Sequence, residues 1–399
     1  MPELDFPGLR EYLARQAAAQ PPFADIRDRR RRRTRRWAVA VATAVVVGLL
    51  TATTVLAGYP RRAPVPPAQS PTPAHSAQIL QPEVSAVAFS PDGTLYAATI
   101  GCPVDCARDL AVSVSRSTDL GATWSVTPVP VTPPVVGVLF APGGARLWSV
   151  NQVEVSGSTD AGATWTRWVG IGANSTDRPA HAGMAGGTLW VAQNGAVGTA
   201  TAEQVPAPTP AQPPGLIEIR TLAALGPDRA AVLTGDTTGT WYQSTDRGRH
   251  WSVLADPCAG TPYPGALDAT MSAGPDGTMW AVCTGSTDGT GAAQPKVLVR
   301  STDGGATWGP ATALDPAGVL VEIVPVSATT AWLTGLGGDL YRTTDAGAHW
   351  NRVAATADPA RPLTLAVRDA DTAAYTRGTA VVVTRDGGRT WTEHPVPTR

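Results

Sequence analysis

An aspartate stands in an eight-residue phrase that recurs six times along this 399-residue chain. The fullest copy is STDGGATW at residues 301–308, and every copy begins with Ser or Thr. A repeated carboxylate can carry chemistry, or it can hold a turn together by accepting hydrogen bonds from backbone N–H groups. The six aspartates are Asp119, Asp160, Asp246, Asp303, Asp345 and Asp386.

Other residue types that could do chemistry form no recognisable constellation. The five histidines are scattered, and two of them, His250 and His349, replace the second threonine of the phrase. The chain has no ligand spacing typical of a metal site, and no glycine-rich phosphate loop precedes a helical pattern. We therefore expect neither a metal nor a cofactor.

The spacing of the phrase points to a repeated structural unit. Each copy ends in a tryptophan, and successive tryptophans are 41, 86, 57, 42 and 41 residues apart, so one copy has decayed near Ala207. The closing residues are Trp124, Trp165, Trp251, Trp308, Trp350 and Trp391. Earlier in each repeat, an apolar residue follows a turn, at Tyr96, Trp148, Trp190, Val232, Trp280, Trp332 and Tyr375. The chain therefore contains seven repeats of about 42 residues.

Each repeat has the sequence pattern of four short strands. An apolar run leads through a Pro-Asp-Gly-type turn into a second strand, an alternating third strand, the phrase, and a short fourth strand that often contains proline. Four strands at this period predict an all-β, seven-bladed β-propeller. The phrase then spans the hairpin between strands three and four. Its glycine supplies a positive φ, and its tryptophan packs on the neighbouring blade.

The phrase resembles the Asp-box, or BNR, repeat S-x-D-x-G-x-T-W, and the resemblance covers about residues 84–399. Sialidases, sortilin-type receptors and photosystem II assembly-factor-like propellers carry this repeat. The resemblance implies a β-propeller whose repeats lie away from the ligand site. It implies a function only loosely, because one fold supports many functions.

A sialidase-like exo-glycosidase is the catalytic alternative that the resemblance raises. Such an enzyme needs three arginines, a Tyr–Glu nucleophile pair and an aspartic acid on the face opposite the Asp boxes. The early Arg-Ile-Pro signature is absent, and Tyr263 alone among the tyrosines falls in a loop of that face. Glu218, Arg220 and Glu322 lie on inner strands and could line the central channel. We expect the chain to be non-catalytic, with these four residues as the candidates otherwise.

The N-terminal part predicts a membrane anchor. Residues 37–58 contain no charge and are long enough to span a bilayer as a helix, and eight arginines lie just before them. The positive-inside rule then puts the N-terminus in the cytoplasm and the propeller outside. A signal peptide cleaved near Ala57 is the alternative. The predicted parts are a cytoplasmic stub (1–36), a transmembrane helix (37–58), a Pro-rich linker (59–77) and the propeller (78–399).

Charge is divided unevenly between these parts. Residues 1–36 carry ten Arg and five acidic residues, whereas the rest of the chain carries 21 basic and 27 acidic ones. The part of the chain after residue 36 thus has a net negative charge, which disfavours binding to the phosphate groups of nucleic acids. We therefore expect no nucleic-acid partner. Lys296 is the single lysine, and this Arg-rich composition is of a bacterial, actinobacterial type.

The four cysteines mark one face of the predicted propeller. Connections between strands two and three, and between one blade and the next, share this loop face, and they are longest around blades 1 and 5. Cys258 precedes strand one of blade 5 and Cys283 ends its strand two, whereas Cys102 and Cys106 bracket one loop of blade 1. We therefore predict the disulfides Cys102–Cys106 and Cys258–Cys283.

Elaborated loops on a rigid scaffold are where binding sites usually lie. The sequence accordingly predicts a membrane-anchored extracytoplasmic module that binds a protein or a cell-envelope glycan through the loop face. An alternative is an envelope sensor that signals through the N-terminal stub.

Overall fold

The computed structural model describes residues 80–102, 111–129, 138–150, 155–168, 181–193, 196–201, 207–209, 211–214, 219–235, 239–264, 269–285, 295–314, 320–335, 338–355 and 363–398. The chain divides into two units, Met1–His75 and Ser76–Arg399. The predicted stub, transmembrane helix and linker lie outside the described residues. Within the described ranges, no helix has the length and hydropathy needed to cross a bilayer.

Among its described residues, the second unit contains 28 strands in seven antiparallel sheets of four strands each. Blade 1 consists of β1 (Leu80–Phe89), β2 (Leu95–Cys102), β3 (Ala111–Ser117) and β4 (Ser125–Val129). Blade 2 consists of β5 (Val138–Gly143), β6 (Arg146–Val150), β7 (Val155–Ser158) and β8 (Thr166–Trp168). Blade 3 consists of β9 (His181–Ala185), β10 (Thr188–Gln193), β11 (Ala196–Ala200) and β12 (Ala207–Pro208). Blade 4 consists of β13 (Ile219–Ala224), β14 (Ala230–Thr234), β15 (Thr240–Ser244) and β16 (Ser252–Val253).

The last three blades follow the same order. Blade 5 consists of β17 (Thr270–Ala273), β18 (Met279–Thr284), β19 (Lys296–Ser301) and β20 (Thr312–Ala313). Blade 6 consists of β21 (Leu320–Pro325), β22 (Ala331–Gly335), β23 (Asp339–Thr343) and β24 (Asn351–Ala355). Blade 7 consists of β25 (Leu365–Val367), β26 (Ala373–Arg377), β27 (Ala380–Thr384) and β28 (Thr392–Pro395). The predicted seven-bladed propeller is confirmed, including the fourth strand of blade 3, where the phrase has decayed.

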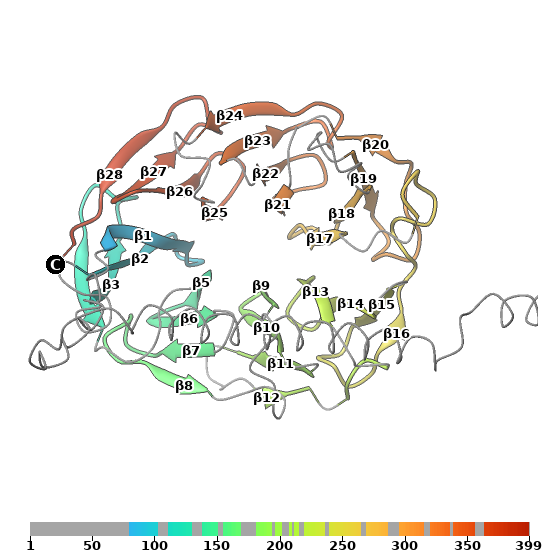
Figure 1. Cartoon of the computed structure of the whole chain (residues 1–399), viewed down its shortest axis with the longest axis horizontal. Coiled ribbons are helices and arrows are strands. Elements are labelled where there is room, and N and C mark those ends of the chain that lie inside the picture. The colour runs from blue at the N-terminus through green and yellow to red at the C-terminus, as the bar shows by residue number, and fades with distance from the viewer. Residues whose placement is uncertain are drawn as a thin grey trace, which may run out of the picture. The chain divides into compact units, whose positions relative to one another are not determined.

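The blades stand in a ring around a central opening, with the first strand of each blade innermost (Figure 1). Blade 7 closes the ring against blade 1 without exchanging a strand. Val87 and Ala97 of blade 1 share a buried cluster with Val381 and Val383 of blade 7. The backbone N–H of Val84 also donates to the carbonyl of Gly378 at 2.7 Å. Apolar packing between the first and last repeats therefore completes the ring.

Large aromatic residues of the second strands fill the spaces between blades. Trp148, Trp190, Trp280 and Trp332 are fully buried, as the repeat pattern predicts for core positions. In three of them, an arginine of the same strand or of the adjacent strand lies over the ring. The arginine Cζ is 5.3 Å from the ring centre for Arg300 and Trp280, and 5.4 Å for the other two pairs. These tryptophans therefore hold adjacent sheets together, and the ring face also meets a cation.

The repeated aspartates hold turns, as one of the two interpretations of the phrase expects. In blade 5, the hydroxyl of Ser301 donates to Asp303 Oδ1 at 2.7 Å. The same Oδ1 accepts the N–H of Thr307 at 2.9 Å, and the N–H of Gly305 donates to Ser301 Oγ at 2.8 Å. Hydrogen bonds, chiefly from the Thr307 side chain, hold the pKa of Asp303 well below its usual range. The carboxylate therefore stays ionised and serves as the fixed acceptor of the hairpin.

The residue directly after each aspartate adopts a left-handed conformation that sequence reasoning missed. Leu120, Ala161, Arg247 and Ala346 have φ between 56° and 65°, although none of them is glycine. The glycine that follows also has a positive φ in every copy, as predicted. The hydrogen bonds of the carboxylate hold this strained pair in place, which explains why the aspartate is repeated with the glycine.

Candidate functional site

The loop face lies at the opposite end of each blade from the Asp boxes. In blade 5, strand pairing aligns Thr270 with Val282 and Thr284 with Lys296 at one end, and Met279 with Ser301 at the other. Ser301 opens the Asp box, so the long connections into β17 and between β18 and β19 belong to the far end. The predicted separation of turns and loops into two faces is therefore confirmed for this blade.

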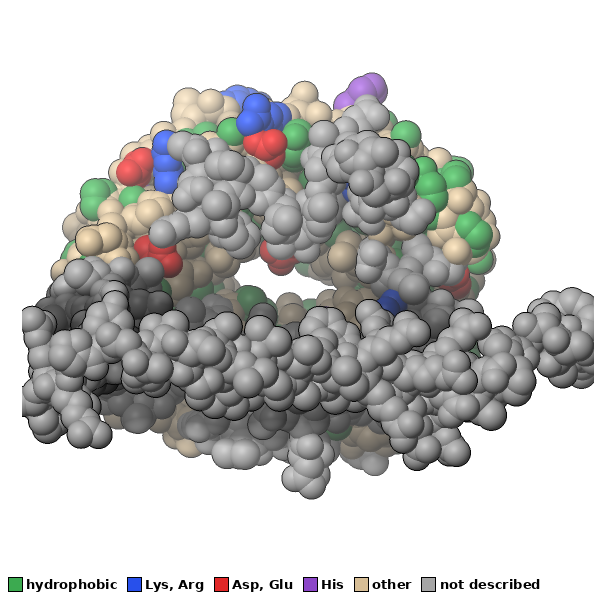
Figure 2. Space-filling model, in the orientation of Figure 1, with side chains coloured by type: hydrophobic (Ala, Val, Ile, Leu, Met, Phe, Trp, Pro, Cys, Tyr) green, Lys and Arg blue, Asp and Glu red, His purple; other side chains and the backbone are tan. Residues whose placement is uncertain are grey.

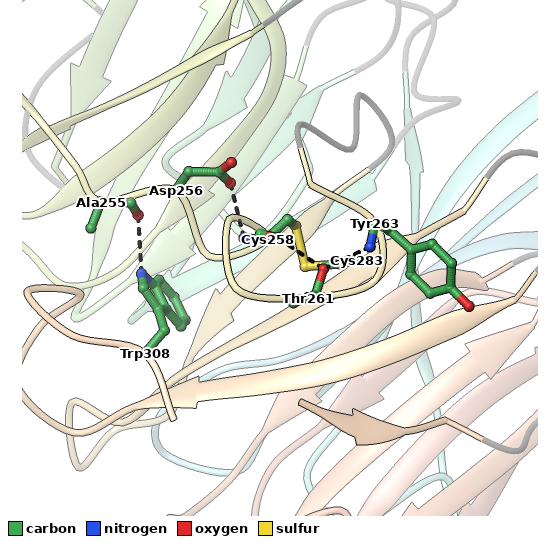
Figure 3. The surroundings of a disulfide bond; sticks show 7 residues. All are labelled: Ala255, Asp256, Cys258, Thr261, Tyr263, Cys283 and Trp308. Atoms are coloured by element: carbon green, nitrogen blue, oxygen red, sulfur yellow. Dashed lines mark hydrogen bonds between the residues drawn. A yellow bond between two sulfur atoms is a disulfide. The ribbon is translucent and has the colours of Figure 1, made fainter. Parts of the chain in front are cut away.

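A disulfide fixes the connection that enters blade 5. Cys258, between β16 and β17, is bonded to Cys283 of β18 with a Cα–Cα distance of 5.7 Å (Figure 3). Both side chains are fully buried and pack with Met279 and Val297. The expected pair thus ties a loop to the second strand of the sheet. Cys102 is also disulfide-bonded, whereas Cys106, its expected partner, lies outside the described residues.

Hydrogen bonds fold the connection tightly around this disulfide. Asp256 Oδ1 accepts the N–H of Cys258 at 2.9 Å, which closes an Asx-turn. The hydroxyl of Thr261 donates to the carbonyl of Cys258 at 2.8 Å, and it accepts the N–H of Tyr263 at 3.1 Å. Three side-chain hydrogen bonds therefore satisfy backbone groups of this loop and hold its conformation.

The catalytic candidates are placed on different parts of the ring. Arg220 lies on β13 of blade 4 and Glu322 on β21 of blade 6, and β17 of blade 5 stands between these two inner strands. Tyr263 is half-buried against the core of blade 5, where a Cβ on Gly285 would lie 2.8 Å from its ring. Glu218 lies outside the described residues. The described candidates form neither a Tyr–Glu pair nor an arginine clamp.

Charges nevertheless reach the central opening. The space-filling view shows the opening passing through the ring, with acidic and basic side chains at its edge (Figure 2). Desolvation by the surrounding protein raises the pKa of Glu322 to about 7, although part of this side chain remains exposed on its inner strand. Arg220 is half-buried, and its Nη1 makes no hydrogen bond within the described structure. This lining is chemically that of a polar channel.

No three potential metal ligands gather among the residues that the structure describes.

A cavity of about 260 Å³ lies beside the disulfide loop, between the connection that enters blade 5 and the segment that joins β19 to β20. Trp308, the closing tryptophan of the Asp box in blade 5, is half-buried there, and its Nε1 donates to the carbonyl of Ala255 at 3.0 Å (Figure 3). The lining residues are Asp256, Pro257, Gly260, Thr261, Val299, Trp308, Gly309, Pro310 and Ala311. Sequence reasoning assigned Trp308 to packing alone.

The chain is similar to known Asp-box propellers. Residues 286–397 match the family model described as photosynthesis system II assembly factor YCF48. This description is of an assembly factor and not of an enzyme, in agreement with the expectation that the chain is non-catalytic. The match supports a BNR-type propeller, and nothing in it supports a sialidase. No curated protein matches the chain by sequence.

Three solved structures illustrate the structural likeness. YCF48 bound to a D1 peptide is 18% identical, with 70% of this chain and 88% of that chain covered and a TM-score of 0.45. YCF48 from Cyanidioschyzon merolae is 17% identical, with 79% and 86% covered and a TM-score of 0.33. A protein of unknown function from Dyadobacter fermentans is 14% identical, with 79% and 92% covered and a TM-score of 0.39. Likeness at this level does not transfer a ligand to this chain.

Proposed function

We propose that this chain is a non-catalytic binding module that holds a segment of another protein on the loop face of its propeller. The observation that carries the proposal is the connection at residues 254–264, which the Cys258–Cys283 bond and three side-chain hydrogen bonds hold in one conformation beside an open cavity. A loop that is ordered before binding loses little entropy when it docks. The Asp-box hairpins at the other end of the blade serve the stability of the fold, so they give no comparable reason to place a ligand there.

The family match supports a protein ligand over other classes. The matched residues 286–397 begin in the connection between β18 and β19 and continue through blades 6 and 7. An assembly factor works by binding the components that it helps to assemble. A cell-envelope glycan remains the other ligand class that the loop face was predicted to serve, and the experiment below separates the two.

Site-specific photo-crosslinking in intact cells tests the proposal. A benzophenone amino acid at Pro262, exposed on the loop face, is expected to give an adduct that contains another protein. The same group at Thr302, exposed in the Asp box of the same blade, is the matched control and is expected to give none. Protein adducts from Thr302 and not from Pro262 would reverse the assignment of the face. A Pro262 adduct that carries sugar and no protein would identify a glycan ligand.

We further propose that residues 37–58 anchor the module in the cytoplasmic membrane and that the propeller lies outside. The uncharged 22-residue stretch and the eight preceding arginines support this topology, and so does a disulfide, which persists in an oxidising compartment.

Reporter fusions check the topology. Alkaline phosphatase fused after residue 399 is expected to be active, because this enzyme becomes active only after export. Green fluorescent protein at the same position is expected to be dark, because it becomes fluorescent only when it folds in the cytoplasm. N-terminal sequencing is expected to find residues 1–58 retained in the mature protein. A mature chain that begins near Gly58 would show a cleaved leader instead of an anchor.

A further inference from the structure

The cavity beside the disulfide loop combines an aromatic face with one carboxylate. Trp308, Pro257 and Pro310 contribute apolar walls, and Asp256 is the single charged residue in the lining. Pro257 is buried, whereas Gly260, Gly309, Pro310 and Ala311 are exposed, so the cavity opens to the surface. Its volume of about 260 Å³ accommodates one long side chain and not a whole folded element.

The carboxylate of Asp256 has a fixed position and a free oxygen. Its Oδ1 accepts the N–H of Cys258 at 2.9 Å, and Cys258 is held by the disulfide. Its Oδ2 takes part in no hydrogen bond or ion pair with the described residues. A half-buried carboxylate held in an Asx-turn is a good partner for a charged donor, because little conformational freedom is lost on pairing.

Elsewhere in this propeller, arginines of the chain itself cover the rings of three buried tryptophans. Arg146, Arg300 and Arg342 lie over the rings of Trp148, Trp280 and Trp332. Trp308 has no such arginine among the described residues, and no basic side chain lines the cavity. The ring next to Asp256 is therefore left for a cation from outside the domain.

The charge of the domain favours the same kind of ligand. Residues 78–399 carry 27 acidic and 19 basic side chains, so a basic segment is attracted to this surface. A guanidinium suits the site better than an ammonium, because its planar fork can stack on an indole and pair with a carboxylate at the same time.

We propose that the cavity between Asp256 and Trp308 binds an arginine side chain of the protein segment held on the loop face. This inference rests on the proposed function and deepens it, since it names the ligand residue that the face selects. The guanidinium lies over the Trp308 ring and pairs with Asp256 Oδ2, and its methylene stem packs between Pro257 and Pro310.

Capped peptides test this selectivity on the full chain in detergent micelles. The probe is acetyl-Gly-Gly-Arg-Gly-Gly-amide, and the comparison peptide contains citrulline, which has the shape of arginine without its charge. The indole N–H signal of Trp308 in a ¹⁵N-labelled protein reports binding at the cavity. We expect the citrulline peptide to bind at least about tenfold more weakly, because it loses the charge-assisted pairing and the cation–π contact. Equal binding of the two peptides would overturn the proposal.

A pair of isosteric variants locates the effect at the cavity. Asp256→Asn is expected to weaken binding of the arginine peptide by about tenfold. Asp276→Asn is the matched control, since Asp276 closes the same kind of Asx-turn with the N–H of Thr278 at 3.0 Å, but on the opposite face of blade 5. That variant is expected to bind as the wild type does. Wild-type affinity of the Asp256→Asn variant for the arginine peptide would show that the peptide does not bind in this cavity, and the proposal would be wrong.

The crosslinking experiment separates this inference from the function on which it rests. If the Pro262 adduct forms with undiminished yield in Asp256→Asn, the loop face binds its partner without the arginine site, and the inference is wrong. If wild-type protein binds the arginine peptide through Asp256 but gives no adduct at Pro262, the site stands and the proposed function falls.

Discussion

Replacing Gly347 with alanine is expected to destabilise the propeller by about 2–5 kcal/mol. Gly347 has a φ of 87°, a conformation that costs an L-residue about 1–2 kcal/mol. A Cβ at this position would overlap Leu298 Cδ2 and lie 3.5 Å from the ring of Trp280. Both neighbours are fully buried in blade 5, so they cannot move aside, and overpacking adds about 1–3 kcal/mol. Denaturant unfolding followed by tryptophan fluorescence measures the loss.

Gly277→Ala provides the matched control for the backbone contribution. Gly277 has a φ of 81°, but no atom lies within 4 Å of a Cβ built there. This variant is expected to lose about 1–2 kcal/mol, from the left-handed conformation alone. The difference between the two variants then measures the contact between blades. Equal losses would mean that the Asp-box glycine serves only the turn and not the packing.

The overall fold could be predicted because its signals repeat within each blade. A closing tryptophan and a second-strand aromatic recur at one period, and both positions bury their side chains between sheets whatever the neighbouring blade contains. The pairing of Cys258 with Cys283 could be predicted for a related reason: chain order and strand direction alone bring both residues to one end of blade 5.

The packing role of the Asp-box glycine could not be predicted in the same way. Its positive φ is a local property of the phrase, whereas its contact partner belongs to the preceding blade. A Cβ on Gly305 would lie 2.5 Å from Leu254 of blade 4, and a Cβ on Gly388 would lie 2.9 Å from Val353 of blade 6. Contacts of this kind depend on the distance between sheets, which no single repeat encodes.

Two histidines show a different limit. His250 and His349 occupy the threonine position of their boxes, and each places Nδ1 2.6–2.7 Å from the second carboxylate oxygen, where a threonine hydroxyl donates in the other copies. From the sequence they read as departures from the phrase. The imidazole reaches the same acceptor because its ring nitrogen lies within reach of the turn, which is a matter of geometry and not of residue class.

The candidate site was predictable as a face and not as a set of contacts. Loop length and cysteine positions located the elaborated end of blade 5. The cavity beside Trp308 depends on how residues 254–264 fold back over blade 5, and this conformation is set by the disulfide and by Asp256 and Thr261 together.

Replacing both Cys258 and Cys283 with alanine is expected to destabilise the protein by about 3–4 kcal/mol. The two residues are 25 positions apart, and a crosslink over a segment of this length restricts the unfolded chain by about that amount. Alanine is preferable to serine here, because both side chains are fully buried and a hydroxyl would be left without water. Denaturant unfolding of the wild type and the double variant under the same oxidising conditions gives the change, because the bond of Cys102 is then kept in both.

The same double variant is expected to weaken binding of the arginine peptide at temperatures where it is still fully folded. The carboxylate of Asp256 is held in the loop by the hydrogen bond that it accepts from the N–H of Cys258. When the disulfide is absent and Cys258 is free to move, the carboxylate can rotate away from Trp308. A melting curve and a peptide titration on one sample separate this effect from global unfolding. If affinity stays at the wild-type value while stability falls, the hydrogen bonds of Thr261 are sufficient to order the loop, and the disulfide serves the core of blade 5 alone.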